Sequence, residues 1–321
     1  MTGRNGRTPI RVLLLGCGYA ARMHSRVLRR MPGVELSYAS RDAARAAAMC
    51  AAHGGVRSWG SYEAGLADPD VQVALVATPT CTHADLALMA LRAARHVIVE
   101  KPAFLTASDA DRVRTVATAA ERQVFVAENY VYKPLAFELR DAIGAGMLGD
   151  VRFVSINATK WQPVDGWRAD PAVSGGGALF EAGVHWLSFA ARIGLDLTAV
   201  QGFRAGPAGN ADRSSLVALR YGNGACGALA HSWELRAPFG GARLSKVQGT
   251  HGAITFESNG FASVTTGRTH RIRVHARDAL GYRAMLTDFL GAVRDRRPAH
   301  YTLDMAQRDL GWLEVAQAGV G

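Results

Sequence analysis

Residues 10–24 read IRVLLLGCGYAARMH, an apolar run that ends on two glycines and continues into a helix-forming stretch. Gly16 closes the run where a tight turn favours glycine, and Gly18 leaves the backbone bare where a pyrophosphate would approach. Ala21 keeps the following helix close to the strand, and the first N–H groups of that helix attract phosphate. The alternative is a structural turn, but the position before a series of strands and helices favours dinucleotide binding.

Further apolar runs follow at residues 34–40, 71–79, 96–101 and 124–129, separated by alanine-rich helical stretches. Strands that are apolar on both faces and alternate with helices indicate a parallel sheet covered on both sides. We therefore predict an α/β fold, with a Rossmann, doubly wound parallel sheet over residues 1–128. Residues 1–9 are expected to form a loose polar tail.

The sequence pattern changes after residue 129. The helices expected after residue 129 span 134–149, 175–194, 279–297 and 303–318, and a strand is expected over 150–161. Residues 198–277 are typical of successive strands joined by Gly- and Asn-containing turns, of which YGNG (221–224) is a hairpin signal. The pattern predicts an α+β domain over residues 129–321 with a mainly antiparallel sheet.

The net charge of +10 comes mostly from arginine, because Lys101, Lys133, Lys160 and Lys246 are the only lysines among 37 basic residues. The arginines are spread along the chain and no nucleic-acid-binding motif accompanies them, so compositional bias explains the charge better than nucleic-acid binding. Residues 268–277 (RTHRIRVHAR) alternate basic and apolar side chains, which predicts a strand with one basic, solvated face. An anion-binding or subunit-contact surface is the alternative there.

No apolar stretch approaches the roughly 20 residues that span a bilayer, and the first residues lack a secretory signal pattern. The cysteines at positions 17, 50, 81 and 226 are scattered, which indicates reduced thiols and no metal site. We expect a cytoplasmic protein without a membrane or nucleic-acid partner.

The end of the second strand, YASRDAAR (38–45), distinguishes between the two nicotinamide cofactors. An NAD site usually carries an acidic residue there, whereas this chain has Ser40 and Arg41, which suit a 2′-phosphate. Asp42 is expected to cap the next helix. NADP(H) is therefore the predicted cofactor, with NAD(H) the alternative.

Two downstream stretches carry candidate chemistry. VIVEKP (97–102) places Lys101 at the carboxyl end of a buried strand, where an ammonium can stabilise negative charge on a substrate oxygen; a surface ion pair is the alternative. GGGALFEAGVHWL (175–187) places Glu181 and His185 four residues apart on one helix face. Such a pair can hold an imidazole tautomer and move a proton near neutral pH.

Taken together, GCGYAARMH, ATPTCTHADLALMALRAARHVIVEKP and WRADPAVSGGGALFEAGVHWL resemble the glucose-fructose oxidoreductase, inositol dehydrogenase and rhizopine catabolism (Gfo/Idh/MocA) oxidoreductases. The resemblance covers nearly the whole chain. It implies a Rossmann domain followed by a domain with an open, mainly antiparallel sheet that forms homodimers or homotetramers. It also implies hydride transfer between a nicotinamide cofactor and a hydroxyl or carbonyl carbon of a sugar, sugar derivative or cyclitol.

The resemblance places the family's lysine on Lys101 and its helix histidine on His185. Glu181 replaces the usual aspartate, which leaves open whether it contacts substrate or only orients His185. The expected cofactor-binding residues are Gly16, Gly18, Tyr19, Ala20, Ala21, Ser40, Arg41, Thr78, Pro79, Thr80, His83, Glu100, Lys101, Pro102 and Asn129. The expected substrate-binding residues are Lys101, Tyr130, Trp161, Trp167, Arg168, Glu181 and His185, with packing as the alternative for both tryptophans.

The sequence thus predicts an NADP(H)-dependent oxidoreductase in which Lys101 polarises the reacting oxygen and His185, partnered by Glu181, acts as general acid–base. Two alternatives remain open: a redox-neutral enzyme that retains its cofactor, such as an epimerase-like enzyme or an oxidative glycosidase, and a non-catalytic dinucleotide-binding sensor.

Overall fold

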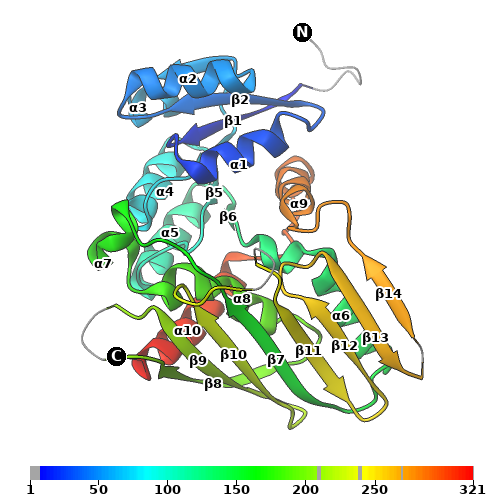
Figure 1. Ribbon diagram of the computed structural model, residues 1–321. Coiled ribbons are helices and arrows are strands. Elements are labelled where there is room, and N and C mark those ends of the chain that lie inside the picture. The colour runs from blue at the N-terminus through cyan, green and yellow to red at the C-terminus, as the bar shows by residue number, and fades with distance from the viewer. Residues whose placement is uncertain (1–7, 208–210, 238–240, 269, 321) are drawn as a thin grey trace. The chain divides into compact units, whose positions relative to one another are not determined.

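The computed structural model describes residues 8–207, 211–237, 241–268 and 270–320 (Figure 1). The chain divides into two compact units, of which the first comprises Met1–Ala127 with Met285–Ala306 and the second Glu128–Ala284 with Gln307–Gly321. Residues 1–7 of the expected tail lie outside the described residues. No helix within the described ranges is long and apolar enough to cross a membrane.

The first unit is built on a parallel sheet (Figure 1). Its strands are β1 (Ile10–Leu15), β2 (Val34–Ala39), β3 (Arg57–Trp59), β4 (Val73–Val76), β5 (His96–Val99) and β6 (Val124–Val126). Its helices include α1 (Tyr19–Leu28), α2 (Ala43–His53), α3 (Tyr62–Leu66), η1 (Thr80–Thr82), α4 (His83–Arg92) and α5 (Ala107–Ala119). The order β3-β2-β1-β4-β5-β6 is that of a dinucleotide-binding fold, which confirms the predicted Rossmann sheet. The edge strand β3 was not predicted, because its first two residues are exposed and polar and form no apolar run.

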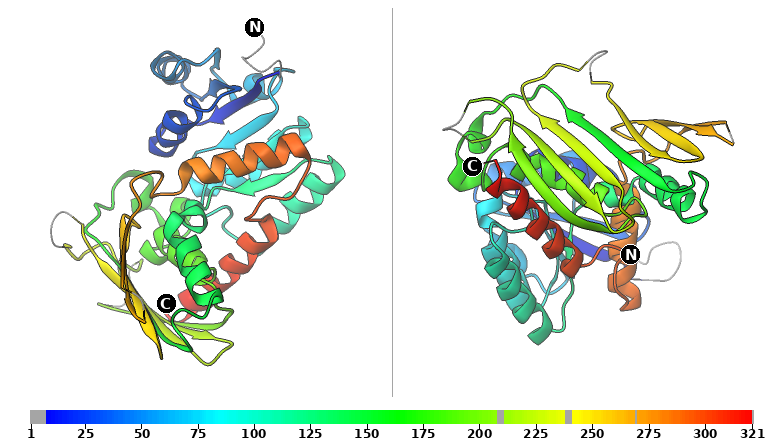
Figure 2. Two further views of the ribbon diagram at one scale, coloured as in Figure 1. Left: turned by 90° about the vertical axis from the view of Figure 1, so that its right-hand side faces the viewer. Right: turned by 90° about the horizontal axis from the view of Figure 1, so that it is seen from below.

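The first unit also contains most of α9 (Tyr282–Asp295), which the sequence assigned to the second domain. The Phe289 ring stacks on Phe125 at the end of the sheet, with 4.9 Å between centroids. The Gln123 side chain donates to the carbonyl of Arg297 at 2.8 Å. Figure 2 shows α9, in orange, beside the strands of this unit. The predicted domain over 129–321 is therefore interrupted, because residues 285–306 pack on the Rossmann sheet.

The second unit is built on a larger sheet of order β14-β13-β12-β11-β7-β10-β9-β8 (Figure 2). Its strands are β7 (Val151–Thr159), β8 (Leu197–Arg204), β9 (Ser214–Tyr221), β10 (Cys226–Ser232), β11 (Leu244–Gly249), β12 (Gly252–Glu257), β13 (Ala262–Gly267) and β14 (Arg271–Val274). Its helical segments are η2 (Asn129–Tyr132), α6 (Pro134–Gly144), η3 (Gly166–Ala169), α7 (Pro171–Ser174), the π-helical turn η4 (Leu179–Gly183), α8 (Val184–Ala190) and α10 (Leu303–Ala318), of which the last begins in the first unit.

Strands β7 and β10 of this sheet run parallel, whereas the other neighbours are antiparallel, which confirms the predicted mainly antiparallel sheet. The YGNG turn closes the β9–β10 hairpin as predicted, with Gly224 at φ +85°. One face of the sheet is buried: Phe256 packs against Phe189 of α8, and the β8 residue Gly202 lies against α10. The opposite face is open and carries exposed apolar side chains, including Phe153 and Leu244.

Strand β14 partly corrects the expectation that residues 268–277 form a strand with a solvated basic face. The predicted alternation is present, but Ile272 and Val274 are the exposed side chains, at 75% and 72%. On the other face, His275 Nε2 lies 3.0 Å and Arg273 Nε 3.6 Å from the carboxylate of Glu138, which is buried on α6. Arg273 and His275 of the basic face therefore pair with a helix of their own unit, whereas Arg271 and Arg277 are exposed as predicted. Thr269 lies outside the described residues.

Candidate active site

The glycine turn between β1 and α1 has the geometry of a phosphate cradle. Gly16 has φ +103°, and a Cβ there would lie 2.7 Å from the carbonyl oxygen of Ala77, so no other residue fits. Gly18 is the N-cap of α1, and a Cβ added to it would meet nothing within 4 Å. A side chain at Gly18 would fill this open space beside the helix N-terminus. Ala21 is fully buried, as close helix–strand packing requires. These residues fit a dinucleotide pyrophosphate.

At the end of β2, Arg41 is exposed, whereas the neighbouring Asp42 carboxylate caps the next helix. Asp42 caps α2, as predicted, by accepting a hydrogen bond from the N–H of Arg45 at 3.1 Å. Ser40 Oγ accepts from the N–H of Asp42 at 3.2 Å. Arg41 lies beside Tyr62; burial raises the pKa of that hydroxyl, and the nearby guanidinium lowers it. The end of β2 thus carries an exposed Arg41 guanidinium, while the Asp42 carboxylate is used as the cap of α2.

The corner after β5 is organised around the carboxylate of Glu100. One oxygen lies 2.5 Å from Nε2 of the buried His24, and the other accepts from the N–H of Lys101 at 3.1 Å. Burial by itself raises the pKa of Glu100, but the hydrogen bond and charge of His24, together with Lys101, lower it to about 2. Glu100 is therefore ionised at neutral pH and anchors the backbone that carries the Lys101 side chain. The peptide bond between Lys101 and Pro102 is cis.

His83 braces this corner against the loop after β4. The residue is buried, with Nδ1 3.0 Å from the Pro102 carbonyl oxygen and Nε2 2.9 Å from that of Thr78. Burial lowers the pKa of the imidazole, although both carbonyls act to raise it. Because both ring nitrogens have backbone partners, we assign His83 a supporting role at the cofactor edge. Thr78 also shares a hydrogen bond with Thr82, at 2.7 Å between the hydroxyl oxygens.

In the second unit, His185 is paired with a carboxylate that the sequence analysis did not select as its partner. His185 Nδ1 lies 2.6 Å from Oε1 of Glu128, a fully buried residue just after β6. The same oxygen accepts from the N–H of Tyr130 at 3.1 Å, so the carboxylate is held in place by η2. With Nδ1–H donating to Glu128, Nε2 of the neutral ring is the nitrogen that can accept a proton. The sequence does place Glu128 at a strand's carboxyl end, but nothing marks it as the partner of a residue 57 positions later.

Glu181 engages Arg168, a pairing that the sequence analysis did not anticipate. Its Oε1 accepts from Nε and Nη2 of Arg168 at 3.3 and 3.2 Å. Residues 179–183 form a π-helical turn that continues directly into α8, which carries His185.

The glycines before this segment pack against Asp212. A Cβ on Gly177 would lie 2.0 Å from Oδ1 of Asp212, so the side chain is excluded by the fold. Asp212 accepts from the N–H of Leu179 through its carboxylate, at 3.0 Å, and from the N–H of Ala178 through its carbonyl, at 2.8 Å. The sequence suggested that the glycines open the helix to a ligand, whereas the structure shows that Asp212 caps these first N–H groups.

The remaining predicted substrate and cofactor residues of the second unit differ in exposure. Trp161 is 56% exposed, and the Arg236 guanidinium lies over its ring at 5.8 Å. Trp167 lies beneath the guanidinium of Arg168, at 4.6 Å from the ring centroid. Asn129 is buried, and its amide donates to the carbonyl of Leu280 at 2.7 Å, which indicates a bracing role.

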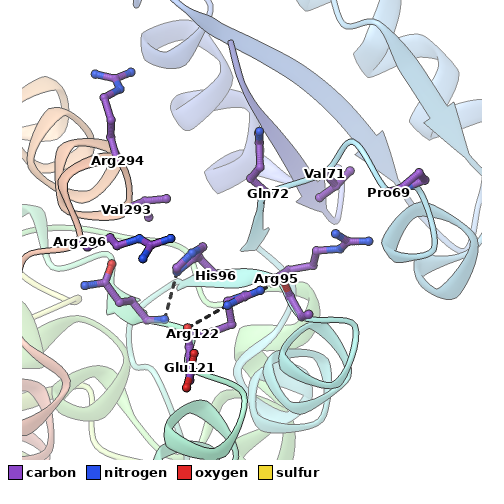
Figure 3. A pocket seen from close by; sticks show the side chains of 12 residues that line it. Pro69, Val71, Gln72, Arg95, His96, Glu121, Arg122, Val293, Arg294 and Arg296 are labelled. Atoms are coloured by element: carbon purple, nitrogen blue, oxygen red, sulfur yellow. Dashed lines mark hydrogen bonds between the residues drawn. The ribbon is translucent and has the colours of Figure 1, made fainter. Parts of the chain in front are cut away.

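A cavity of about 680 Å³ lies at the opposite, amino-terminal edge of the Rossmann sheet (Figure 3). Arginines line it, and two of them bind carbonyls where helices end: Arg95 those of Leu66 and Asp68, and Arg122 those of Ala94 and Glu121. Positive side chains stabilise helix carboxyl ends in this way. This cavity does not include any of the predicted site residues.

Comparison with known proteins finds a family model that matches residues of each unit. A family model described as an oxidoreductase family with an NAD-binding Rossmann fold matches residues 10–128, and the GFO/IDH/MocA C-terminal domain matches residues 137–255. A dTDP-3,4-didehydro-2,6-dideoxy-alpha-D-glucose 3-reductase from Streptomyces violaceoruber is 39% identical over 162 residues, which are 48% of this chain and 44% of that protein. The chain spans about half the length of the curated relatives it matches.

Solved structures match over nearly the whole chain. GenD2 from gentamicin A biosynthesis, in complex with NAD, has a TM-score of 0.84 at 25% identity, covering 99% of this chain and 96% of its own. KijD10, a 3-ketoreductase from Actinomadura kijaniata in complex with NADP and TDP-benzene, has a TM-score of 0.84 at 22% identity, covering 97% and 98%. With both family models in sequence order and the glycine turn in place, the chain belongs to the Gfo/Idh/MocA family of NAD-binding oxidoreductases.

Proposed function

We propose that this protein is an NADP(H)-dependent oxidoreductase that acts on a hydroxyl or carbonyl carbon of a sugar, sugar derivative or cyclitol. The observation that carries the proposal is the 2.6 Å pair of His185 and the buried Glu128, because a fixed imidazole tautomer is what proton transfer to a substrate oxygen needs. The substrate class is supported by two relatives, a 1,5-anhydro-D-fructose reductase and the dTDP-sugar 3-reductase from Streptomyces violaceoruber.

The chain's own groups have distinct roles in this reaction. Lys101 binds the reacting oxygen and stabilises negative charge on it, and Glu100 fixes the backbone from which Lys101 projects. His185 takes the hydroxyl proton through Nε2 during oxidation and returns it during reduction, while Glu128 stabilises the imidazolium. The bound nicotinamide supplies the hydride chemistry. Screening sugars, cyclitols and sugar nucleotides for a change in reduced-nicotinamide absorbance tests the proposal, and a cofactor that never exchanges would instead favour a redox-neutral enzyme.

Arg41 is proposed to select NADP(H) by pairing with the 2′-phosphate. Arg41→Ala is expected to weaken NADPH binding by about 10- to 100-fold, because a charge-assisted hydrogen bond to phosphate is lost. Fluorescence titration with NADPH and NADH measures this, and NADH affinity is expected to stay unchanged. A natural preference for NADH that the substitution does not alter would contradict the assignment.

The open face of the second unit's sheet is proposed to join two copies of the chain into a homo-oligomer. Phe153, Leu216 and Leu244 are 62%, 41% and 68% exposed on this face, and exposed apolar side chains gathered on one face favour an interaction site. The proposed cytoplasmic location rests on Cys17, Cys50, Cys81 and Cys226, which are unpaired thiols.

Phe153→Asp is expected to convert the assembly into monomers, because a carboxylate would be buried on both sides of the contact. Light scattering coupled to size-exclusion chromatography measures the mass. The control is Val56→Asp, which places the same charge at an exposed apolar position of the first unit and should leave the mass unchanged. A monomeric unsubstituted protein would refute the assembly.

A further inference from the structure

Lys133 is a fully buried lysine at the start of α6. Its Nζ lies 3.3 Å from the centroid of the Tyr130 ring and 5.2 Å from that of Trp186. Its hydrogen bond to the Ser258 carbonyl is long, at 3.4 Å, and no carboxylate of the described residues forms an ion pair with it. The ammonium is therefore held mainly by aromatic faces, a costly arrangement that calls for a functional explanation.

The Tyr130 ring connects this ammonium to the proposed catalytic histidine. His185 stacks on Tyr130 with 4.3 Å between centroids and 12° between planes. A ring face covered at that distance has no room for an ammonium 3.3 Å from its centroid, so Lys133 and His185 occupy opposite faces. The ammonium thus lies within roughly 8 Å of the imidazole, close enough for substantial charge repulsion inside a protein.

We propose that Lys133 is a positioning residue for His185: it holds the Tyr130 ring against the imidazole and opposes the protonation that Glu128 favours. The inference rests on the proposed general acid–base role of His185. Glu128 alone would hold a proton on His185 strongly, whereas the opposing charge lets the proton leave more easily.

The charged groups around the Lys133–Tyr130–His185 stack have opposing effects on the charge of Lys133. Glu128 just before η2, Arg243 before β11 and Glu257 on β12 act on Lys133, and His231 on β10 interacts with His185, with Glu181 on η4 and with Lys160. Burial lowers the pKa of Lys133 to about 7, with Arg243 acting in the same sense and Glu128 and Glu257 opposing it. The Lys133 charge is therefore present below about pH 7 and is lost as the pH rises through that value.

The test is Lys133→Met, which fills the same space without the charge. The His185 imidazole is titrated by NMR in histidine-labelled protein, with the signal assigned from His185→Gln. The midpoint is expected to rise by about one pH unit. With an active substrate, the acid limb of kcat/KM for hydroxyl oxidation should shift by the same amount. The control, Arg112→Met, removes an exposed positive charge from α5 of the first unit and should shift neither.

An unchanged His185 midpoint in folded Lys133→Met would overturn the proposal. Should that variant fail to fold, Lys133→Gln takes its place, and an unchanged His185 midpoint in that variant also overturns the proposal. The NMR titration needs no turnover, so inactivity on every sugar would count against the proposed function and not against this coupling.

Discussion

Lys101→Ala is expected to lower kcat by about 100- to 1,000-fold while leaving NADPH affinity almost unchanged. The reason is that the ammonium acts on the reacting oxygen as charge develops there, whereas the pyrophosphate is held by the turn at Gly16 and Gly18. Stopped-flow or steady-state kinetics with the best substrate of the sugar panel, together with NADPH fluorescence titration, separates the two effects.

The control for this prediction is Arg112→Ala, which removes an exposed positive charge from α5 of the first unit. Its kcat should match that of the unsubstituted protein. If Lys101→Ala instead abolishes NADPH binding while kcat at saturating cofactor is retained, Lys101 holds the cofactor and the proposed role in oxygen polarisation is wrong.

Glu128→Gln is expected to lower kcat by about 100- to 10,000-fold, the range associated with losing a positioned acid–base group or its tautomer control. The amide can still accept one hydrogen bond from His185, but it no longer stabilises the imidazolium, and its NH₂ group can hold the wrong tautomer. The measurement is kcat across pH, with thermal unfolding as a check that the buried substitution leaves the protein folded.

Glu181→Gln provides the matched comparison, because it makes the same change four residues before His185. The Glu181 carboxylate accepts from Arg168, so we expect a smaller loss of kcat and a larger effect on KM. A larger loss of kcat in Glu181→Gln than in Glu128→Gln would make Glu181, and not Glu128, the main partner of His185.

Features that depend on the local backbone were predictable from the sequence. The Gly16 turn, the Asp42 cap and the YGNG hairpin are each determined by a few consecutive residues, since positive φ, side-chain capping and tight turns have local sequence signals. The parallel sheet was predictable for a related reason, because each strand and helix shows its own apolar periodicity. These features place the proposed cofactor turn on the Rossmann sheet and Lys101 at the carboxyl end of a strand.

Pairings between distant segments were decided only by the tertiary structure. Glu128 meets His185, Asp212 caps the segment after Gly177, and Glu138 binds the basic side of β14. The alternation in β14 showed that it has two different faces, but not which one packs inward. The sequence by itself thus determined the elements and the residue types of the candidate site, whereas the tertiary structure decided which carboxylate each histidine and arginine meets, because those contacts depend on strand order and helix packing.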